Sequence, residues 1–192
     1  MRSAQIERKT KETHVQINVA LDGKGSTSNR TDVRFLDHLL DSFATHSLID
    51  LEVKAEGDLQ HHIVEDVALA LGSALNKALG DRVGINRFGY AIVPMDETLA
   101  LAAVDLVRRP FASIHLQLER AMLEDAPRED LEHFLPSLST TLEGTVHVKV
   151  LEGRNDHHKM EAAFKAFARA LGSAIAFDPR RSSQLPSSKG VM

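Results

Sequence analysis

A histidine-rich motif occurs twice in this chain of 192 residues. The pattern His-His-x-x-Glu begins at His61 and again at His157, 96 residues later. A further histidine precedes each copy at nearly the same distance, because His38 lies 23 residues before His61 and His133 lies 24 before His157. Imidazole and carboxylate groups together are ligands for first-row transition metals. The repeated spacing therefore predicts metal chemistry.

Helix geometry predicts two metals rather than one. Adjacent residues on a helix project about 100° apart, so His61 and His62 cannot easily coordinate the same ion. Glu65 is three or four residues away and can stand beside either. Six histidines and two glutamates allow three imidazoles and one carboxylate for each of two metals, which leaves an octahedral ion open to water or substrate. Mn, Fe, Co, Ni and Zn all fit such ligands. The candidate ligands are His38, His61, His62, Glu65, His133, His157, His158 and Glu161.

Other polar residues carry weaker signals. Asp96 and Glu97 could serve as acid and base or simply form a turn. Residues 187–190 (SSKG) offer hydroxyls, backbone N–H groups and an ammonium, which suits either an anion cradle or a flexible tail. Four histidines fall outside the repeated pattern, and structural roles are favoured for them: His14, His46, His115 and His147.

Hydrophobic periodicity predicts the elements that position these residues. Strands are expected at 15–21, 51–55, 88–93, 99–106, 114–118 and 146–150, and helices at 35–46, 61–79, 129–139 and 157–176. Pro136 should distort or interrupt the third helix, and the tail from residue 177 should be loop. Each half therefore contains strand, helix, strand and ligand-bearing helix. We predict an internally duplicated α+β fold, with helices on one face of a small sheet in each half.

Composition excludes several classes of protein. The net charge of −4 does not favour nucleic acid or an anionic membrane as a partner. The absence of cysteine excludes disulfides, thiolate metal sites and a cysteine nucleophile. Neither a secretory signal nor a membrane-spanning run is found in the sequence. We expect a soluble cytoplasmic protein.

Five sequence blocks resemble, in family order, those of imidazoleglycerol-phosphate dehydratase. They are FLDHLL, HHIVEDVALALGSAL, RFGYAIVPMDETLA, GRNDHHKMEAAFKAFARAL and PSSKGV, and the resemblance extends from about residue 8 to 191. It implies a duplicated sandwich of the ribosomal protein S5 domain 2-like type, with halves 1–84 and 85–192 and a substrate-binding tail on the second half. It further implies that 24 identical chains assemble, with di-manganese sites between neighbouring subunits.

The implied reaction is a step of histidine biosynthesis that dehydrates imidazole glycerol phosphate to imidazole acetol phosphate. Two Mn²⁺ ions would hold the substrate ring as imidazolate, so that the ring acts as the electron sink without an organic cofactor. The resemblance makes the eight residues above the metal ligands. Candidate acid–base residues are Glu12, Glu65, Asp96, Glu97 and Glu161, with Asp96 favoured over Glu97. Candidate substrate-binding residues are Glu12, His38, His46, Arg87, Arg109, His157, Lys165, Ser187, Ser188 and Lys189.

The chain departs from the family pattern at three places. The loop 57–61 before the paired histidines is about three residues shorter and lacks further acidic residues, Ser42 replaces a common glutamine, and residues 107–108 are larger than usual. None of these changes removes a ligand. Two alternatives stay open on the residues alone: a dinuclear phosphate-ester hydrolase, and a non-catalytic metal-binding scaffold.

Overall fold

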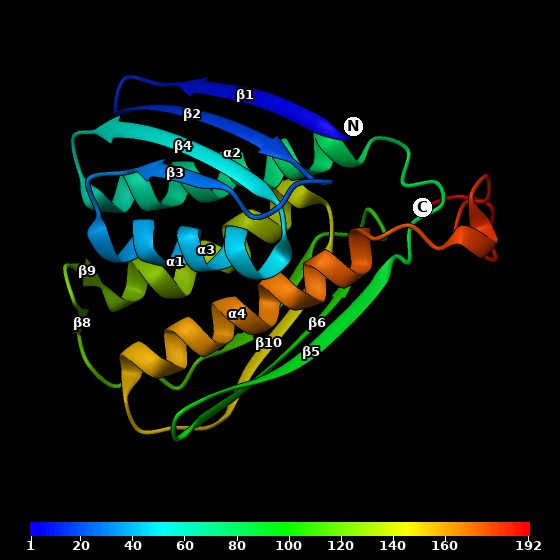
Figure 1. The fold of residues 1–192 in the computed structure, drawn as a ribbon. Helices are drawn as coiled ribbons and strands as arrows, with labels where there is room; N and C mark the ends of the chain where they lie inside the picture. The colour runs from blue at the N-terminus through cyan, green and yellow to red at the C-terminus, as the bar shows by residue number, and fades with distance from the viewer.

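The computed structural model describes residues 1–192, and two halves with the same order of elements follow one another (Figure 1). The first half contains β1 (Ser3–Lys9), β2 (Thr13–Ala20), β3 (Thr27–Arg30), α1 (Arg34–Ser47), β4 (Asp50–Gly57) and α2 (Gln60–Leu79). The second contains β5 (Phe88–Met95), β6 (Thr98–Asp105), β7 (Phe111–His115), α3 (Arg128–Leu142), β10 (Thr145–Glu152) and α4 (Asp156–Ile175). A short hairpin, β8 (Met122–Leu123) and β9 (Ala126–Pro127), is inserted before α3. A 3₁₀ turn, η1 (Pro179–Arg181), follows α4.

The two four-stranded sheets have the same topology. Their strand orders are β1-β2-β4-β3 and β5-β6-β10-β7. In both, the edge strand β3 or β7 runs parallel to its neighbour, whereas the other pairs are antiparallel. Strand β2 buries Val15, Ile17 and Val19 on one face, the alternation expected of a sheet covered on one side. The predicted α+β class and the internal duplication are confirmed.

The four helices lie between the two sheets and pair across the halves (Figure 1). Helix α1 packs on α4, and α2 packs on α3. Close approach requires glycine in both pairs. A Cβ on Gly72 would overlap the Thr141 side-chain oxygen, and one on Gly172 would stand 2.9 Å from the Ser47 carbonyl oxygen. A single cluster of 53 buried hydrophobic residues fills the space between the sheets, so neither half has a core of its own.

The structure corrects three details of the expected elements. The strand expected at 114–118 lies at Phe111–His115. Pro136 does not interrupt α3, which runs without a break through Leu142. Pro136 has no N–H to donate to the Glu132 carbonyl oxygen, so the helix continues with one internal hydrogen bond fewer. Strands β1 and β3 and the β8–β9 hairpin were not expected. None of the helices combines the length and the hydrophobicity that a membrane-spanning helix needs.

The link between the halves carries a buried arginine. Arg82 is 1% exposed. Its guanidinium donates to the carbonyl oxygens of Leu142 and Glu143, at 2.7 and 3.0 Å, and to Asn76 Oδ1 at 2.7 Å. Those carbonyls end α3, where the helix dipole favours a cation. Burial lowers the pKa of Arg82 to about 10, so the side chain is still charged at neutral pH.

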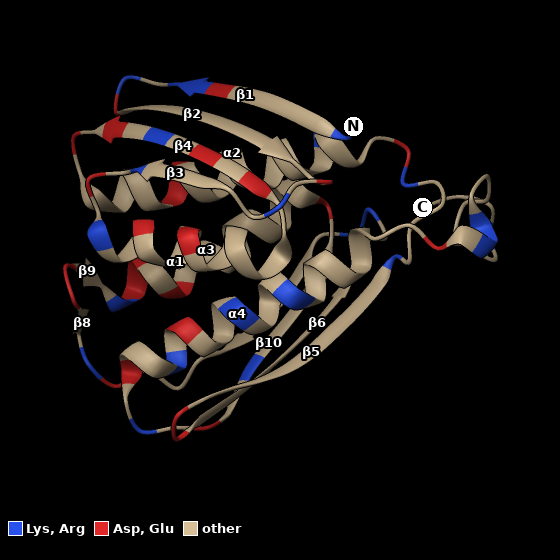
Figure 2. Ribbon diagram, in the orientation of Figure 1, with Lys and Arg blue, Asp and Glu red and all other residues tan.

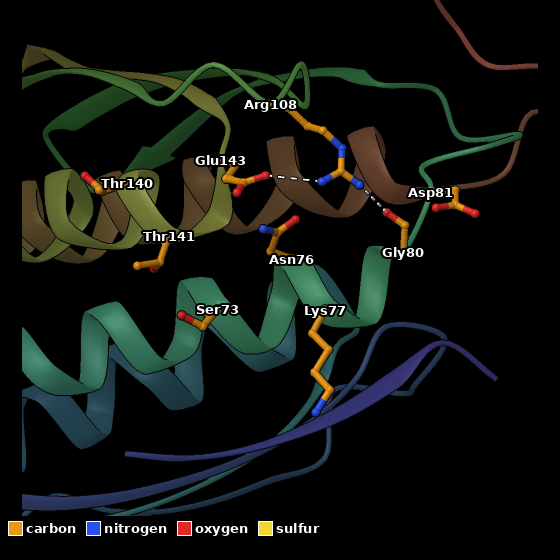
Figure 3. A pocket seen from close by; sticks show the side chains of 9 residues that line it. All are labelled: Ser73, Asn76, Lys77, Gly80, Asp81, Arg108, Thr140, Thr141 and Glu143. Carbon is orange, nitrogen blue, oxygen red and sulfur yellow. Dashed lines mark hydrogen bonds and ion pairs between the residues drawn. The ribbon is translucent and has the colours of Figure 1, made fainter. Parts of the chain in front are cut away.

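A polar hollow lies beside this link, between α2 and α3 (Figure 3). Arg108, one of the larger residues at 107–108, pairs with Glu143 at 3.2 Å and donates to the Gly80 carbonyl oxygen at 2.8 Å. Arg108 therefore has a structural role here, since it ties the loop after β6 to the ends of both helices.

We predict that Arg82→Met destabilises the protein by about 2–4 kcal/mol, because it leaves one buried and two partly buried acceptors without their charged donor. Thermal unfolding of the metal-free protein, followed by circular dichroism, measures the loss. Arg169→Met is the matched control, since Arg169 is exposed on α4 and makes no hydrogen bond or ion pair. Equal unfolding midpoints for the two variants would contradict the role of Arg82.

Candidate metal centre

Three of the eight candidate ligands meet between α1 and α4. His38 extends from α1, whereas His157 and Glu161 stand one turn apart on α4. The Nε2 atoms of the two histidines lie 3.1 and 3.2 Å from the same oxygen, Glu161 Oε2. One donor atom from each residue lies within 4.8 Å of the other two. The three residues come from both halves of the chain, so the crossing of α1 and α4 creates the cluster.

Glu161 is held in its charged form. Burial alone would raise the pKa of this carboxyl, but hydrogen bonds from Lys165 and His38 outweigh it and lower the pKa to about 2. The ammonium of Lys165 lies 2.8 Å from Glu161 Oε1, which leaves Oε2 facing the histidines. The ring of Phe35 packs 5.0 Å from that of His157 and limits its movement. The cluster is therefore a preformed set of two imidazoles and one carboxylate, which fits a transition metal ion.

The pseudo-equivalent cluster lies between α2 and α3. The His61 and His133 ring centroids are 6.4 Å apart, and Glu65 stands one turn after His61, as Glu161 does after His157. His61 Nδ1 lies 2.7 Å from Asp130 Oδ1, which raises the pKa of the histidine. The ligand atoms of this cluster do not all lie within 4.8 Å of one another, as those of the first do, although the residue types and their order are the same.

The second histidine of each pair faces away from these clusters. The rings of His61 and His62 are inclined at 63°, and those of His157 and His158 at 83°. His62 Nδ1 lies 2.7 Å from Asp58 Oδ1 and 3.9 Å from a Glu12 oxygen. The short loop before α2 therefore still supplies a carboxylate to this histidine.

His158 faces the β5–β6 hairpin. Its Nδ1 lies 2.8 Å from Glu97 Oε2, and its Nε2 lies 3.7 Å from Asp96 Oδ2. The backbone N–H groups of Asn155 and Arg154 donate to Glu97 Oε1. These bonds, with that of His158, hold the pKa of Glu97 far below its usual range. Both oxygens of Glu97 are occupied by these bonds, whereas the side chain of Asp96 is 78% exposed, so the arrangement favours Asp96 over Glu97 for acid–base work.

Most of the predicted phosphate-binding residues lie at the end of the molecule opposite the histidine clusters. Helix α4 spans about 30 Å from His157 to its last turn, and the tail begins only beyond that turn (Figure 1). Arg87 donates to the Pro186 carbonyl oxygen at 2.9 Å and so holds the tail there. Arg109 is exposed after β6. Figure 2 shows acidic residues along α1, α3 and the start of α4, whereas η1 in the tail is basic. Within one chain, the structure does not bring these residues to the histidine clusters.

Lys165 and His46 lie between the two ends. Lys165 contacts Glu161, as described above, and His46 faces α4 from α1. Burial lowers the pKa of His46, and the charges of Lys165 and Arg169 lower it further. His46 is therefore neutral near pH 7 and can exchange hydrogen bonds with a ligand beside Lys165. Arg169, whose charge acts on His46, was not predicted as a site residue, because no repeat or spacing in the sequence distinguishes it.

Several carboxylates that lie beside the histidines were also not predicted from the sequence. Asp58, Glu124 and Asp130 each lie within 3.2 Å of a histidine Nδ1. Asp58 stands four residues before His62, a spacing that could have been recognised. The others are separated by tens of residues from the histidines they contact, so no local pattern predicts them.

Comparison with known proteins gives one consistent result. Residues 31–171 match a family model described as imidazoleglycerol-phosphate dehydratase. The chloroplastic imidazoleglycerol-phosphate dehydratase of Pisum sativum is 48% identical over the whole chain, which covers 69% of that protein. The dehydratase of Methanothermobacter thermautotrophicus is 46% identical, with 100% of this chain and 98% of that protein covered.

Two solved structures of such dehydratases have the same fold. That from Pyrococcus furiosus superposes with a TM-score of 0.85 at 35% identity and covers 97% of this chain and 100% of its own. The structure from Staphylococcus aureus superposes with a TM-score of 0.84 at 34% identity and covers 92% of this chain and 99% of its own. Both similarities include the two sheets and the helices between them.

We predict that Asp125→Ala lowers stability by about 1 kcal/mol and loosens the helix that carries His38. Asp125, at the tip of the β8–β9 hairpin, accepts hydrogen bonds from the backbone N–H groups of Arg34 and Phe35 at 2.7 and 2.9 Å. Urea unfolding of the metal-free protein measures the loss, and hydrogen exchange at these two amides measures the loosening. Asp125→Asn keeps an acceptor and should lose less, so an equal loss would contradict a capping role.

Proposed function

The chain belongs to the imidazoleglycerol-phosphate dehydratase family, a hydro-lyase family of histidine biosynthesis, and from this premise we propose that its histidine clusters form a di-manganese active site. The observation that carries the proposal is the convergence of His38, His157 and Glu161 on one point. Family membership makes the chain a dehydratase acting on imidazole glycerol phosphate. It leaves no support for the hydrolase or scaffold alternatives.

The eight histidines and glutamates of the repeated pattern would hold the metals. We assign His38, His157 and Glu161 to one cluster and His61, His133 and Glu65 to the other. His62 and His158 point outward and are available to metals at the edge of the chain. Bound Mn²⁺ would act as a Lewis acid that stabilises the substrate ring in its imidazolate form.

Two free carboxylates stand beside the outward histidines and would move the protons. The C–H proton next to the substrate ring passes to one carboxylate, and the departing hydroxyl takes a proton from another, so that one water molecule leaves. Glu12, near His62, and Asp96, near His158, have the exposure and position for these roles. Glu97 positions His158 rather than exchanging a proton.

The distance between the histidine clusters and the tail supports self-association. A substrate of this size cannot extend about 30 Å from the histidines to the tail of the same chain. We therefore propose that Arg87, Arg109 and the tail residues 187–189 bind the phosphate at the active site of a neighbouring copy. Lys165 and His46 would contact the same substrate from the chain that holds the metals. Assembly into 24 chains is the form that the family resemblance implies.

We also propose that the duplicated units are residues 1–84 and 85–192, each with one ligand-bearing helix. The junction between them would then be the turn that holds Arg82. A cytoplasmic location stays a prediction.

We predict that the metal-free protein does not turn over imidazole glycerol phosphate and that added Mn²⁺ restores the formation of imidazole acetol phosphate. Glu161→Gln should lower kcat at least about 100-fold, because it removes the negative charge of the carboxylate that, with the two facing imidazoles, would hold an ion. The assay is product formation by the assembled, metal-loaded protein.

Glu52→Gln is the matched control, since Glu52 lies on the outer face of the first sheet and contacts only Asn18 and Lys54. It should retain wild-type turnover. Full activity after complete removal of metal would refute the di-manganese proposal but leave the family assignment intact.

A further inference from the structure

All four paired histidines share a contact that is not part of the repeated motif. In each, Nδ1 lies within hydrogen-bond distance of a carboxylate oxygen. The pairs are His61 with Asp130 at 2.7 Å, His62 with Asp58 at 2.7 Å, His157 with Glu124 at 3.2 Å and His158 with Glu97 at 2.8 Å. The four carboxylates come from four different segments of the chain, so the repeat of the histidines does not by itself explain them.

This contact selects the nitrogen that can bind a metal. A neutral imidazole has one N–H, and the nitrogen that donates it has no free lone pair for an ion. A carboxylate at Nδ1 keeps the proton there and leaves Nε2 as the ligand atom. In the first cluster, His157 has a carboxylate oxygen 3.2 Å from each nitrogen, from Glu124 at Nδ1 and from Glu161 at Nε2. An ion held by Glu161 and Nε2 would leave the proton on Nδ1, facing Glu124.

Asp130 differs from the other three carboxylates in its burial. Its side chain is 4% exposed, whereas those of Asp58, Glu124 and Glu97 are 55%, 51% and 37% exposed. A buried carboxylate is costly unless it is paired, and His61 is the only side chain that Asp130 contacts through a hydrogen bond or ion pair. The bond is shielded from water on the side of Asp130, so it holds the ring more firmly than an exposed pair would.

The position of Asp130 links the halves. It lies in the first turn of α3, three residues before His133, and accepts from a histidine on α2. Helix α3 therefore supplies both a ligand of the second cluster and the group that orients another. The N-terminus of a helix also stabilises a negative charge, so a test must separate orientation of His61 from stabilisation of α3.

We propose that Asp130 is a positioning residue, which fixes the proton of His61 on Nδ1 and presents Nε2 to the metal of the second cluster. This role rests on the proposed two-metal function. It predicts that loss of Asp130 lowers the affinity for one of the two ions bound by each chain and leaves the affinity for the other unchanged.

The experiment is a titration of metal-free protein with Mn²⁺ alone, in which the free ion is measured by electron paramagnetic resonance. The wild-type protein should bind two ions per chain. Asp130→Ala should lower the affinity for one of them by about 10- to 100-fold. The affinity of Asp130→Asn should lie between those of the wild type and Asp130→Ala, because its amide oxygen still accepts a hydrogen bond from Nδ1 but carries no charge. Glu129→Gln is the matched control, since Glu129 is exposed in the same helical turn and contacts no histidine.

Each other outcome is decisive. Two ions bound with wild-type affinity by folded Asp130→Ala would overturn the positioning role. Equal weakening in Asp130→Ala and Glu129→Gln would also overturn it, since the charge at the start of α3 would then be the cause. A wild-type protein that binds no Mn²⁺ would instead refute the two-metal proposal on which this inference rests. If Asp130→Ala fails to fold, the isosteric Asp130→Asn decides, and wild-type affinity in that variant would overturn the role.

Discussion

Adjacent side chains on an α-helix diverge by about 100°, and this constraint governs how the chain uses its paired histidines. In each pair one imidazole faces the other half of the molecule and the other faces a loop at the end of a sheet. No single helix can enclose an ion with such a pair. The ligand helices α2 and α4 therefore need partners on two sides, and the rest of the architecture supplies them.

The inner partners depend on the exchange of helices between the halves. Because α1 packs on α4 and α2 on α3, each ligand helix meets a histidine from the opposite half. Gly72 and Gly172 permit the close approach that this requires. A half folded alone would lack both the partner histidine and most of the shared core. The stability of the fold and the geometry of the clusters thus come from the same contacts.

Periodicity and repeated spacing predicted much of this arrangement from the sequence. The Ala- and Leu-rich helices and the ligand pattern depend on local signals, so their positions were close to those observed. Strand β3, with the sequence TSNR, has no apolar alternation and forms only because β4 offers an edge. Leu116 and Leu118 are buried in a loop, so their alternation imitated a strand and displaced the prediction from Phe111–His115.

The carboxylates that orient the histidines show where such reasoning stops. Asp130 and His61 are 69 residues apart and meet only because α2 and α3 pack together. Repetition could not reveal Asp130, because its counterpart at His157 is Glu124, in a hairpin that the first half lacks. Duplication preserved the ligands, which must satisfy the metal, whereas the groups behind them need only reach Nδ1 and can come from any nearby segment. A search for positioning residues therefore has to begin from contacts at Nδ1, not from sequence repeats.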